Sequence, residues 1–411
     1  MAMKQTQTKL FDFSDVGLDF SAGSKNLFPD RFKKMLALGY NVQTVNSVAV
    51  AGNQVTFTYG GAHGYAADRV LKVDSGALSL INEGEFWIDI VTTNTVTFTL
   101  DNAPVSVPNG FTTRIAPLGW SLEYENANVH IYKFKHIDET DLFIRLVFQN
   151  NLAYRNTVSV CIGKTANLTL GTITDPNSIE NNRENLTPVA GPNWEFTYNA
   201  NNTYNNYNYA QGLSMFGLGR VVGSKYHVAF LFNAHNQIAS TRICGFFPFS
   251  PVYGYEQLGY PALFVEETTS TISSILNTPY GLLHTRAYIG KIRCMGDQIR
   301  AAYTVNTRFY PTTPRAFQSF TTLDSFNTSI AEPMRLYEAG TDQFLGMISS
   351  GIYACSFDST NAPPFANMSN PSLTADIDLN NLVVMSLLSQ TTTLSGMAFF
   401  ALPVEEVKIA T

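Results

Sequence analysis

The chain has 411 residues, of which 45% are hydrophobic, 13% aromatic and 14% charged. This length and apolar content predict a sizeable core and roughly two or three folded domains, and the scarcity of charged residues favours β structure. The formal net charge of -6 excludes a general electrostatic attraction to nucleic acid. No apolar run is long enough to span a bilayer, and residues 1–15 lack the apolar core of a secretory signal. We therefore expect a protein made and folded in a cytosol, with no membrane partner.

An extended arm is expected at the beginning of the first domain, residues 1–40. Its apolar residues follow neither a helical nor an alternating period, and Asp and Gly interrupt them. Such a segment has no face of its own to bury, so we expect it to lie against a partner protein. The side chains predicted to make these contacts are Phe11, Phe13, Leu18 and Phe20.

A short helix is predicted next, in "NLFPDRFKKMLALGY". Pro29 suits a first helical turn, and Gly39 is a plausible end. Phe28, Phe32 and Leu36 fall on one face, which we expect to pack on a sheet.

Residues 41–117 are predicted to form a small Ig-like β-sandwich. Short alternating runs such as "NQVTFTYG" and "TVTFTL" are separated by turn signals at close spacing. Residues 118–411 remain β-rich, with strand candidates between Asn-, Pro- and Gly-rich loops, and predict a larger β-rich domain. The fold class is therefore expected to be mainly β.

Several segments carry a family resemblance: "VNSVAVAGNQVTFTYGGAHGYAADRVLKVDSG", "APLGWSLEYENANVHIYKF" and "GLGRVVGSKYHVAFLFNAHNQIASTRICGFFPFSPVYGYEQLGY". Together with neighbouring runs, which cover about half of the chain, they resemble virion structural proteins of tailed bacteriophages. The resemblance implies a structural, non-enzymatic component of the tail, baseplate or neck, assembled in the host bacterial cytoplasm. Its implied partners are other virion proteins and copies of itself.

His63 lies between glycines, just after the run "VTFTYGG". A metal ligand or general base would need a second group, and Asp68 is the nearest candidate along the chain. A turn residue whose imidazole hydrogen-bonds a backbone carbonyl fits the same spacing, with Gly61 and Gly64 supplying unusual φ values. We predict the turn.

Two further motifs have weak chemical signals. "GLGRVVG" resembles a phosphate loop, but its last spacing is one residue too long and a strand pattern follows instead of a helix. "HIDETD", residues 136–141, has enough carboxylates for calcium but lacks EF-hand spacing. We predict a hairpin or tight loop for the first and a solvated acidic turn for the second.

The four cysteines form no C-x-x-C pair, which favours buried free thiols over a zinc or redox site. No G-x-S-x-G elbow occurs; "GLSMFG" has the wrong spacing. A pairing of Cys244 with His227 or His235 in space stays open. We accordingly predict no catalytic residue, no metal site and no cofactor.

The run "TYNANNTYNNYNYAQG" offers amphipathic rings among amides, which suit protein or sugar contacts. We favour a contact between subunits through Tyr204, Tyr207 and Tyr209. The alternative function is a receptor- or glycan-binding tail module, in which this loop and "FFPFSPVYGYEQLGY" would face outward to a host-surface glycan. A polysaccharide-degrading enzyme would need a pair of carboxylates that the sequence does not reveal.

Overall fold

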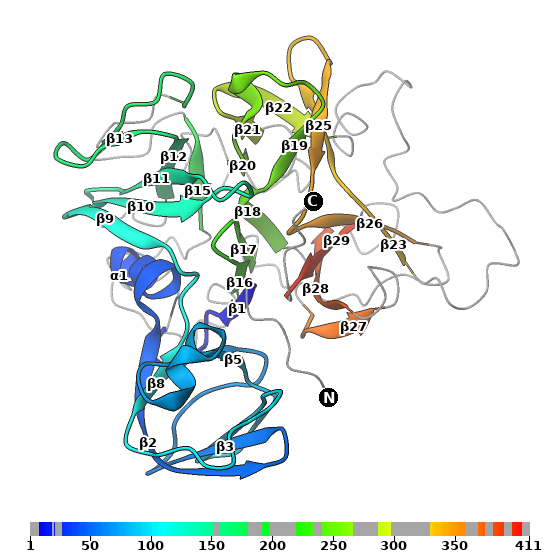
Figure 1. Ribbon diagram of the computed structural model, residues 1–411. Coiled ribbons are helices and arrows are strands. Elements are labelled where there is room, and N and C mark those ends of the chain that lie inside the picture. The colour runs from blue at the N-terminus through cyan, green and yellow to red at the C-terminus, as the bar shows by residue number, and fades with distance from the viewer. Residues whose placement is uncertain are drawn as a thin grey trace, which may run out of the picture.

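The fold is mainly β, as the sequence predicts (Figure 1). Antiparallel sheets dominate it, and α1 (Phe28–Lys33) is the one α-helix among the residues described. In the same residues no helix is long and apolar enough to cross a membrane. The structure, a computed structural model, describes residues 8–18, 20, 27–151, 157–179, 191–196, 219–233, 241–265, 287–296, 329–357, 369–374, 381–389 and 397–404.

The predicted helix forms and ends where the sequence indicates. Pro29 lies in its first turn, and α1 continues as a wider π-helical turn, η2 (Lys34–Leu38). Gly39 ends it with φ of +75°. A Cβ atom at that position would lie 2.3 Å from the carbonyl oxygen of Ile115, so the site requires glycine for space as well as for conformation.

The small β domain is built around one long strand. β2 (Tyr40–Ala51) pairs with β8 through its first residues and with β3 through the remainder, so it belongs to both halves of a seven-stranded sheet. Phe57 and Phe98 meet inside with ring centroids 5.1 Å apart, and both are fully buried. The order is β5 (Glu85–Trp87), β4 (Val70–Val73), β8 (Thr112–Ile115), β2, β3 (Gln54–Tyr59), β7 (Thr95–Thr99), β6 (Ile90–Val91), and the short helical turns are η3 (Ala77–Leu80) and η4 (Asn82–Gly84).

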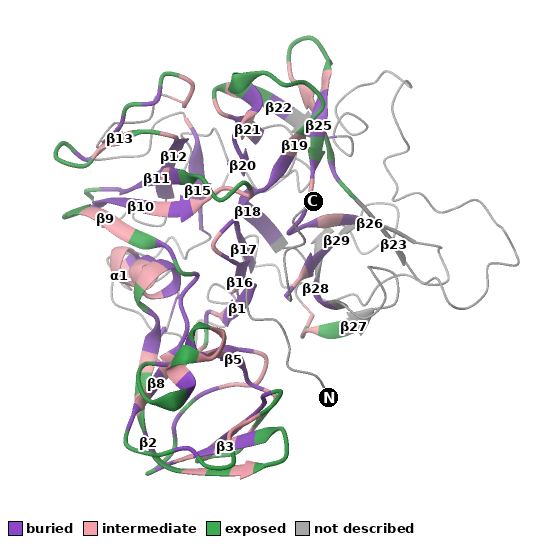
Figure 2. Cartoon of the chain, viewed as in Figure 1, coloured by how far each residue is buried: buried purple, intermediate pink, exposed green. Residues whose placement is uncertain are grey.

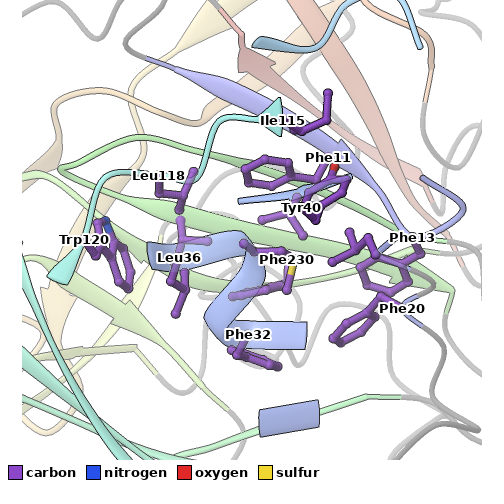
Figure 3. Packing of buried hydrophobic residues seen from close by; sticks show 14 of the residues in the cluster. Phe11, Phe13, Phe20, Phe32, Leu36, Tyr40, Ile115, Leu118, Trp120 and Phe230 are labelled. Atoms are coloured by element: carbon purple, nitrogen blue, oxygen red, sulfur yellow. The ribbon is translucent and has the colours of Figure 1, made fainter. Parts of the chain in front are cut away.

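A five-stranded antiparallel sheet follows, and helix α1 packs beside it. Figure 3 shows Phe32 of the helix pointing into the same cluster as Phe230, and its ring centroid lies 5.2 Å from those of Phe148 and Phe230. The helix therefore links two sheets through one apolar core. The strands are β15 (Asn193–Glu195), β12 (Thr157–Gly163), β11 (Asp141–Phe148), β10 (Val129–Lys135) and β9 (Ser121–Asn126); the hairpin β13 (Ala166–Asn167) and β14 (Thr172–Ile173) branches from it.

A ten-stranded sheet forms the centre of the molecule and curls back on itself. Its last strand, β19, continues β18 after Pro248, while β18 pairs with β20 and β19 with β25. We call the resulting ring of strands, β18 through β25 and back to β19, the curled barrel. The order is β1 (Lys9–Asp12), β16 (Gly219–Gly223), β17 (Val228–Asn233), β18 (Thr241–Phe247), β20 (Ala262–Phe264), β21 (Ala287–Ile289), β22 (Ile292–Gly296), β24 (Arg335–Glu338), β25 (Phe344–Ile348), β19 (Phe249–Pro251).

The last sheet contacts the central one, since β28 packs against β18. Buried side chains of both, such as Phe247 and Phe400, belong to a second hydrophobic cluster. Figure 2 shows the buried residues concentrated along the central strands and the exposed ones at the loop ends. The strands of this sheet are β23 (Ser329–Glu332), β26 (Tyr353–Phe357), β29 (Met397–Pro403), β28 (Asn381–Ser389) and β27 (Ser372–Thr374).

Candidate functional site

The N-terminal segment does not form an outward arm, which corrects the prediction for its apolar side chains. β1 is the edge strand of the ten-stranded sheet and pairs with β16 from Lys9 to Asp12. Figure 3 shows three of the predicted contact residues, Phe11, Phe13 and Phe20, within the chain's own core. All four predicted contact residues are buried, with exposed fractions of 2% or less: Phe11, Phe13, Leu18 and Phe20. The physical reason is that β16, some two hundred residues further along, supplies the apolar surface that the sequence suggested a partner would supply.

Charged side chains fix this segment to the small β domain and to the central sheet. Asp15 pairs with Arg69 at 2.9 Å and accepts a hydrogen bond of 2.7 Å from the hydroxyl of Tyr40. Lys9 pairs with Glu85 at 2.8 Å; burial lowers the pKa of Lys9, and the carboxylate of Glu85 opposes that shift. All four charged groups lie mostly or wholly buried, so the segment ties the small domain firmly to the sheet that contains β1.

His63 is a structural residue, as predicted. Its Nδ1 accepts a hydrogen bond of 2.9 Å from the backbone N–H of Tyr65, which leaves Nε2 to donate to the carbonyl of Thr95 at 3.1 Å. The ring is 2% exposed, and burial lowers its pKa. Gly64 has φ of +71° beside it. Both ring nitrogens are used in holding the turn, so neither is available to a metal or a substrate.

A serine and a histidine do meet, at the turn between β16 and β17. Ser224 Oγ lies 2.9 Å from Nδ1 of His227 and also accepts a hydrogen bond from the backbone N–H of Tyr226. Both side chains are completely buried, and burial lowers the pKa of His227 to about 3. A dyad with no exposed atom offers no position for a substrate, so we assign this pair to the turn. Residues 219–223 of the motif "GLGRVVG" form β16, the first strand of this hairpin, in agreement with the predicted hairpin.

The acidic segment 136–141 forms the turn between β10 and β11. Asp138 Oδ1 accepts a hydrogen bond of 2.9 Å from the backbone N–H of Thr140, and Asp141 pairs with Lys135 at 2.6 Å. The carboxylates therefore have separate partners, as in an ordinary solvated turn. Within the described residues, no group of three or more His, Cys, Asp or Glu side chains could hold a metal ion.

Three connections of the curled barrel share one rim. Successive strands of the barrel are antiparallel, so the loop 252–261, the turn 290–291 and the turn 339–343 all lie at the same end (Figure 1). The first loop begins with the backbone N–H of Val252 donating to the carbonyl of Leu345, 2.8 Å away. This rim is the first candidate for binding, because loops on a rigid strand scaffold commonly carry function.

Two tyrosines stand out on this rim. Tyr253 is 36% exposed and Tyr255 is 63% exposed, and their ring centroids lie 5.8 Å apart with 29° between the ring planes. Val252, beside them, is 54% exposed. Among the side chains that the structure describes, these two rings are the aromatic ones with an exposed fraction of 36% or more. They lie within the segment "FFPFSPVYGYEQLGY", which would face outward in the alternative function, a receptor- or glycan-binding module.

The hairpin of β13 and β14 carries the second candidate surface, which we call the leucine tip and define as Leu168 and Leu170. Leu168 is 38% exposed and Leu170 is 69% exposed. Asn167 holds the turn through its Oδ1, which accepts hydrogen bonds of 3.0 Å from the backbone N–H groups of Thr169 and Leu170. Gly171, with φ of +67°, completes the turn.

The leucine tip and the rim are connected at their bases. The hydroxyl of Tyr260 donates to Asp175 Oδ2 at 2.8 Å, and the same oxygen accepts from the backbone N–H of Lys164 at the start of the hairpin. Nζ of Lys164 lies 4.6 Å from the ring centroid of Tyr260. Both exposed surfaces are therefore fixed to one buried support.

The leucine tip was not predicted from the sequence, although "NLTLG" contains two leucines in a turn bounded by Asn and Gly. Cys161, Cys244 and Cys294 are buried free thiols, as predicted. Tyr204, Tyr207 and Tyr209 lie outside the described residues, as does His235. Comparison with known proteins gives no relative: no family model, no curated protein and no solved structure matches the chain.

Proposed function

We propose that the chain is a structural component of a tailed-phage virion, in the tail, baseplate or neck, and that it acts by assembling with copies of itself and with other virion proteins. The proposal assigns it no catalytic step. It is made in the host bacterial cytoplasm and resides in the particle. The resemblance of its sequence to such proteins motivates the proposal, and the leucine tip is the structural observation that carries it.

The leucine tip suits a protein contact. The side chains of Leu168 and Leu170 cannot hydrogen-bond, so water is their least favourable surrounding and another apolar surface their most favourable one. The capped turn already holds them in one conformation, so burying them against a neighbour costs little further backbone entropy.

The buried clamp of the N-terminal segment supports the same role. It joins the small β domain to the central sheet through Lys9 and Glu85 and through Asp15 and Arg69. A subunit that must keep fixed distances between its contacts in a particle benefits from such rigid coupling, because preorganised contacts bind more tightly.

Incorporation into particles tests the proposal. The double variant Leu168→Ser, Leu170→Ser is supplied during infection in place of the wild-type chain, and mass spectrometry of purified particles measures its amount relative to the other virion proteins. We expect the wild-type chain in a fixed ratio and the double variant at least tenfold reduced. An amine-reactive cross-linker on wild-type particles should join Lys164, at the base of the tip, to a neighbouring protein.

Leu80→Ser is the matched control, because Leu80 is 88% exposed but lies in the small β domain. It should be incorporated like the wild type. Absence of the wild-type chain from purified particles would overturn the virion role. Normal incorporation of the double variant would remove the leucine tip from the assembly contacts.

A further inference from the structure

The rim of the curled barrel carries an aromatic surface that the assembly role does not use. Residues 251–257 are all exposed, and Tyr253 and Tyr255 stack on one another there. The more exposed ring, that of Tyr255, has nearly two thirds of its surface open. Gly254, between them, has no atom within 4 Å of the position that a Cβ would take, so the space beside the pair is open.

The loop is held from below although its outer residues are exposed. The backbone N–H of Val252 bonds to β25 at its start, and the short helical turn η7 (Glu256–Leu258) closes it. Leu258 and Tyr260 are buried at its end, and Tyr260 is hydrogen-bonded to Asp175. The two rings are therefore presented by a fixed scaffold and do not have to be ordered when a ligand arrives.

We propose that Tyr253 and Tyr255 form a stacking platform for a neutral pyranose sugar. One face of a pyranose ring presents C–H groups, which pack on the face of an aromatic ring, while the sugar hydroxyls remain at its edge. Tyrosine suits this contact because it is apolar across the ring and polar at the hydroxyl. Mouths of barrels are frequent positions for small ligands.

The composition of the loop favours a sugar. Its exposed side chains combine two aromatic rings and one valine with polar groups directly beside them. The next residues, Glu256 and Gln257, are exposed and polar, and their oxygens can accept hydrogen bonds from sugar hydroxyls.

The local charge selects neutral sugars. Glu256 follows Tyr255 directly, and Asp342 is exposed on one neighbouring turn of the same rim. The exposed Lys291, on the other turn, directs its Nζ to the backbone carbonyl of Pro176. The chain as a whole carries a formal net charge of -6. Carboxylated or phosphorylated glycans would meet repulsion at this position, whereas neutral hexoses and N-acetylhexosamines would not.

Saturation-transfer NMR with the full chain tests the platform. The probes are chitotriose and maltotriose, with trigalacturonic acid as the acidic comparison. We expect transfer to the ring protons of at least one neutral trisaccharide and at least tenfold weaker binding of the acidic one. Tyr255→Ala should weaken neutral binding at least tenfold, and Tyr253→Ala should weaken it as well.

Two further variants make the result specific. Tyr255→Phe keeps the ring and should retain binding within about threefold, because stacking does not need the hydroxyl. Leu80→Ala, on the small β domain, should leave sugar binding unchanged. Circular dichroism of each variant confirms that the fold is intact.

The proposal is overturned if neither neutral trisaccharide shows transfer, or if Tyr255→Ala binds like the wild type. It is also overturned if Tyr255→Ala leaves sugar binding unchanged but prevents incorporation of the chain into particles. That result would make the rim a protein contact. Failure here leaves the assembly role intact, because that role is tested through the leucine tip.

Discussion

The carboxylate of Asp15 receives two hydrogen bonds from the guanidinium of Arg69, from Nε to Oδ2 at 2.9 Å and from Nη2 to Oδ1 at 3.0 Å. This bidentate pair joins the turn after β1 to the small β domain, and the hydroxyl of Tyr40 adds a third hydrogen bond to Oδ2. Two charges held in this way satisfy each other in a place that water scarcely reaches.

Replacing Asp15 by Ala should therefore lower the free energy of unfolding by about 3–5 kcal/mol, because the buried guanidinium of Arg69 loses its counter-charge. Urea unfolding of the full chain measures the change. Asp141→Ala is the matched control: its partner Lys135 is 40% exposed and the pair should contribute less than about 1 kcal/mol. Equal effects of the two substitutions would show that the clamp does not hold the segment.

Phe20 lies in a cluster of phenylalanine rings, 4.2 Å from Phe13 and 4.8 Å from Phe28 between ring centroids. Phe20→Ala should cost about 3–5 kcal/mol of unfolding free energy, because it leaves a cavity in the core. Val16→Thr, in the same segment but 55% exposed, should cost less than about 0.5 kcal/mol. If Phe20→Ala lowered the free energy of unfolding as little as Val16→Thr but weakened association with other copies, the result would support an outward arm instead.

Stability should fall as the pH falls below about 6.5, the ordinary pKa of histidine. Burial lowers the pKa of His130 to about 4, against the carboxylate of Glu125, and that of His227 to about 3. Between pH 6.5 and those values the unfolded chain binds more protons than the folded one. Each histidine then removes up to about 1.4 kcal/mol of stability per pH unit.

His227→Asn isolates one of these contributions. Asn keeps a polar atom beside Ser224 but does not titrate, so the variant should lose stability less steeply than the wild type between pH 6 and pH 4. Above pH 7 the unfolding free energies of the variant and the wild type should change with pH in parallel, because His227 is neutral in both the folded and the unfolded chain. Parallel curves throughout the acidic range would contradict its burial as a neutral ring.

Gly39 and Gly52 both have positive φ, but their surroundings differ. A Cβ at Gly39 would lie 2.3 Å from the carbonyl oxygen of Ile115, whereas one at Gly52 would meet no atom within 4 Å. Gly52→Ala should cost about 1–2 kcal/mol for its conformation alone. Gly39→Ala should cost clearly more, since the end of η2 must also move; thermal unfolding of both variants compares them, and equal costs would contradict the close approach to Ile115.

Local features were predictable from the sequence because their causes are local. Pro29 and Gly39 mark the two ends of the helical segment, and the glycines around His63 indicated a turn. The alternating runs "NQVTFTYG" and "TVTFTL" indicated strands, and they contain β3 with Phe57 and β7 with Phe98.

The destination of the N-terminal segment and the closure of the curled barrel could not be predicted, because each depends on pairing between distant strands. Apolar residues such as Phe11 show that a surface will be buried, but nothing in their spacing tells whether β16 or another protein covers it. Likewise, Phe249 reads as part of one strand with Phe247, while its partner Ile348 lies about a hundred residues away. The exposure of Tyr255 followed only from that closure.

The pairing of β1 with β16 also limits when the N-terminal segment can fold during synthesis. Asp12 meets Arg220 across 208 positions of sequence, so a ribosome has released the aromatic N-terminal segment long before its acceptor strand exists. At the usual pace of synthesis, about 5–20 residues per second, that segment remains without its sheet for at least about ten seconds. This segment therefore cannot reach its native position until β16 has been made, and during that interval its aromatic side chains stay exposed to other chains.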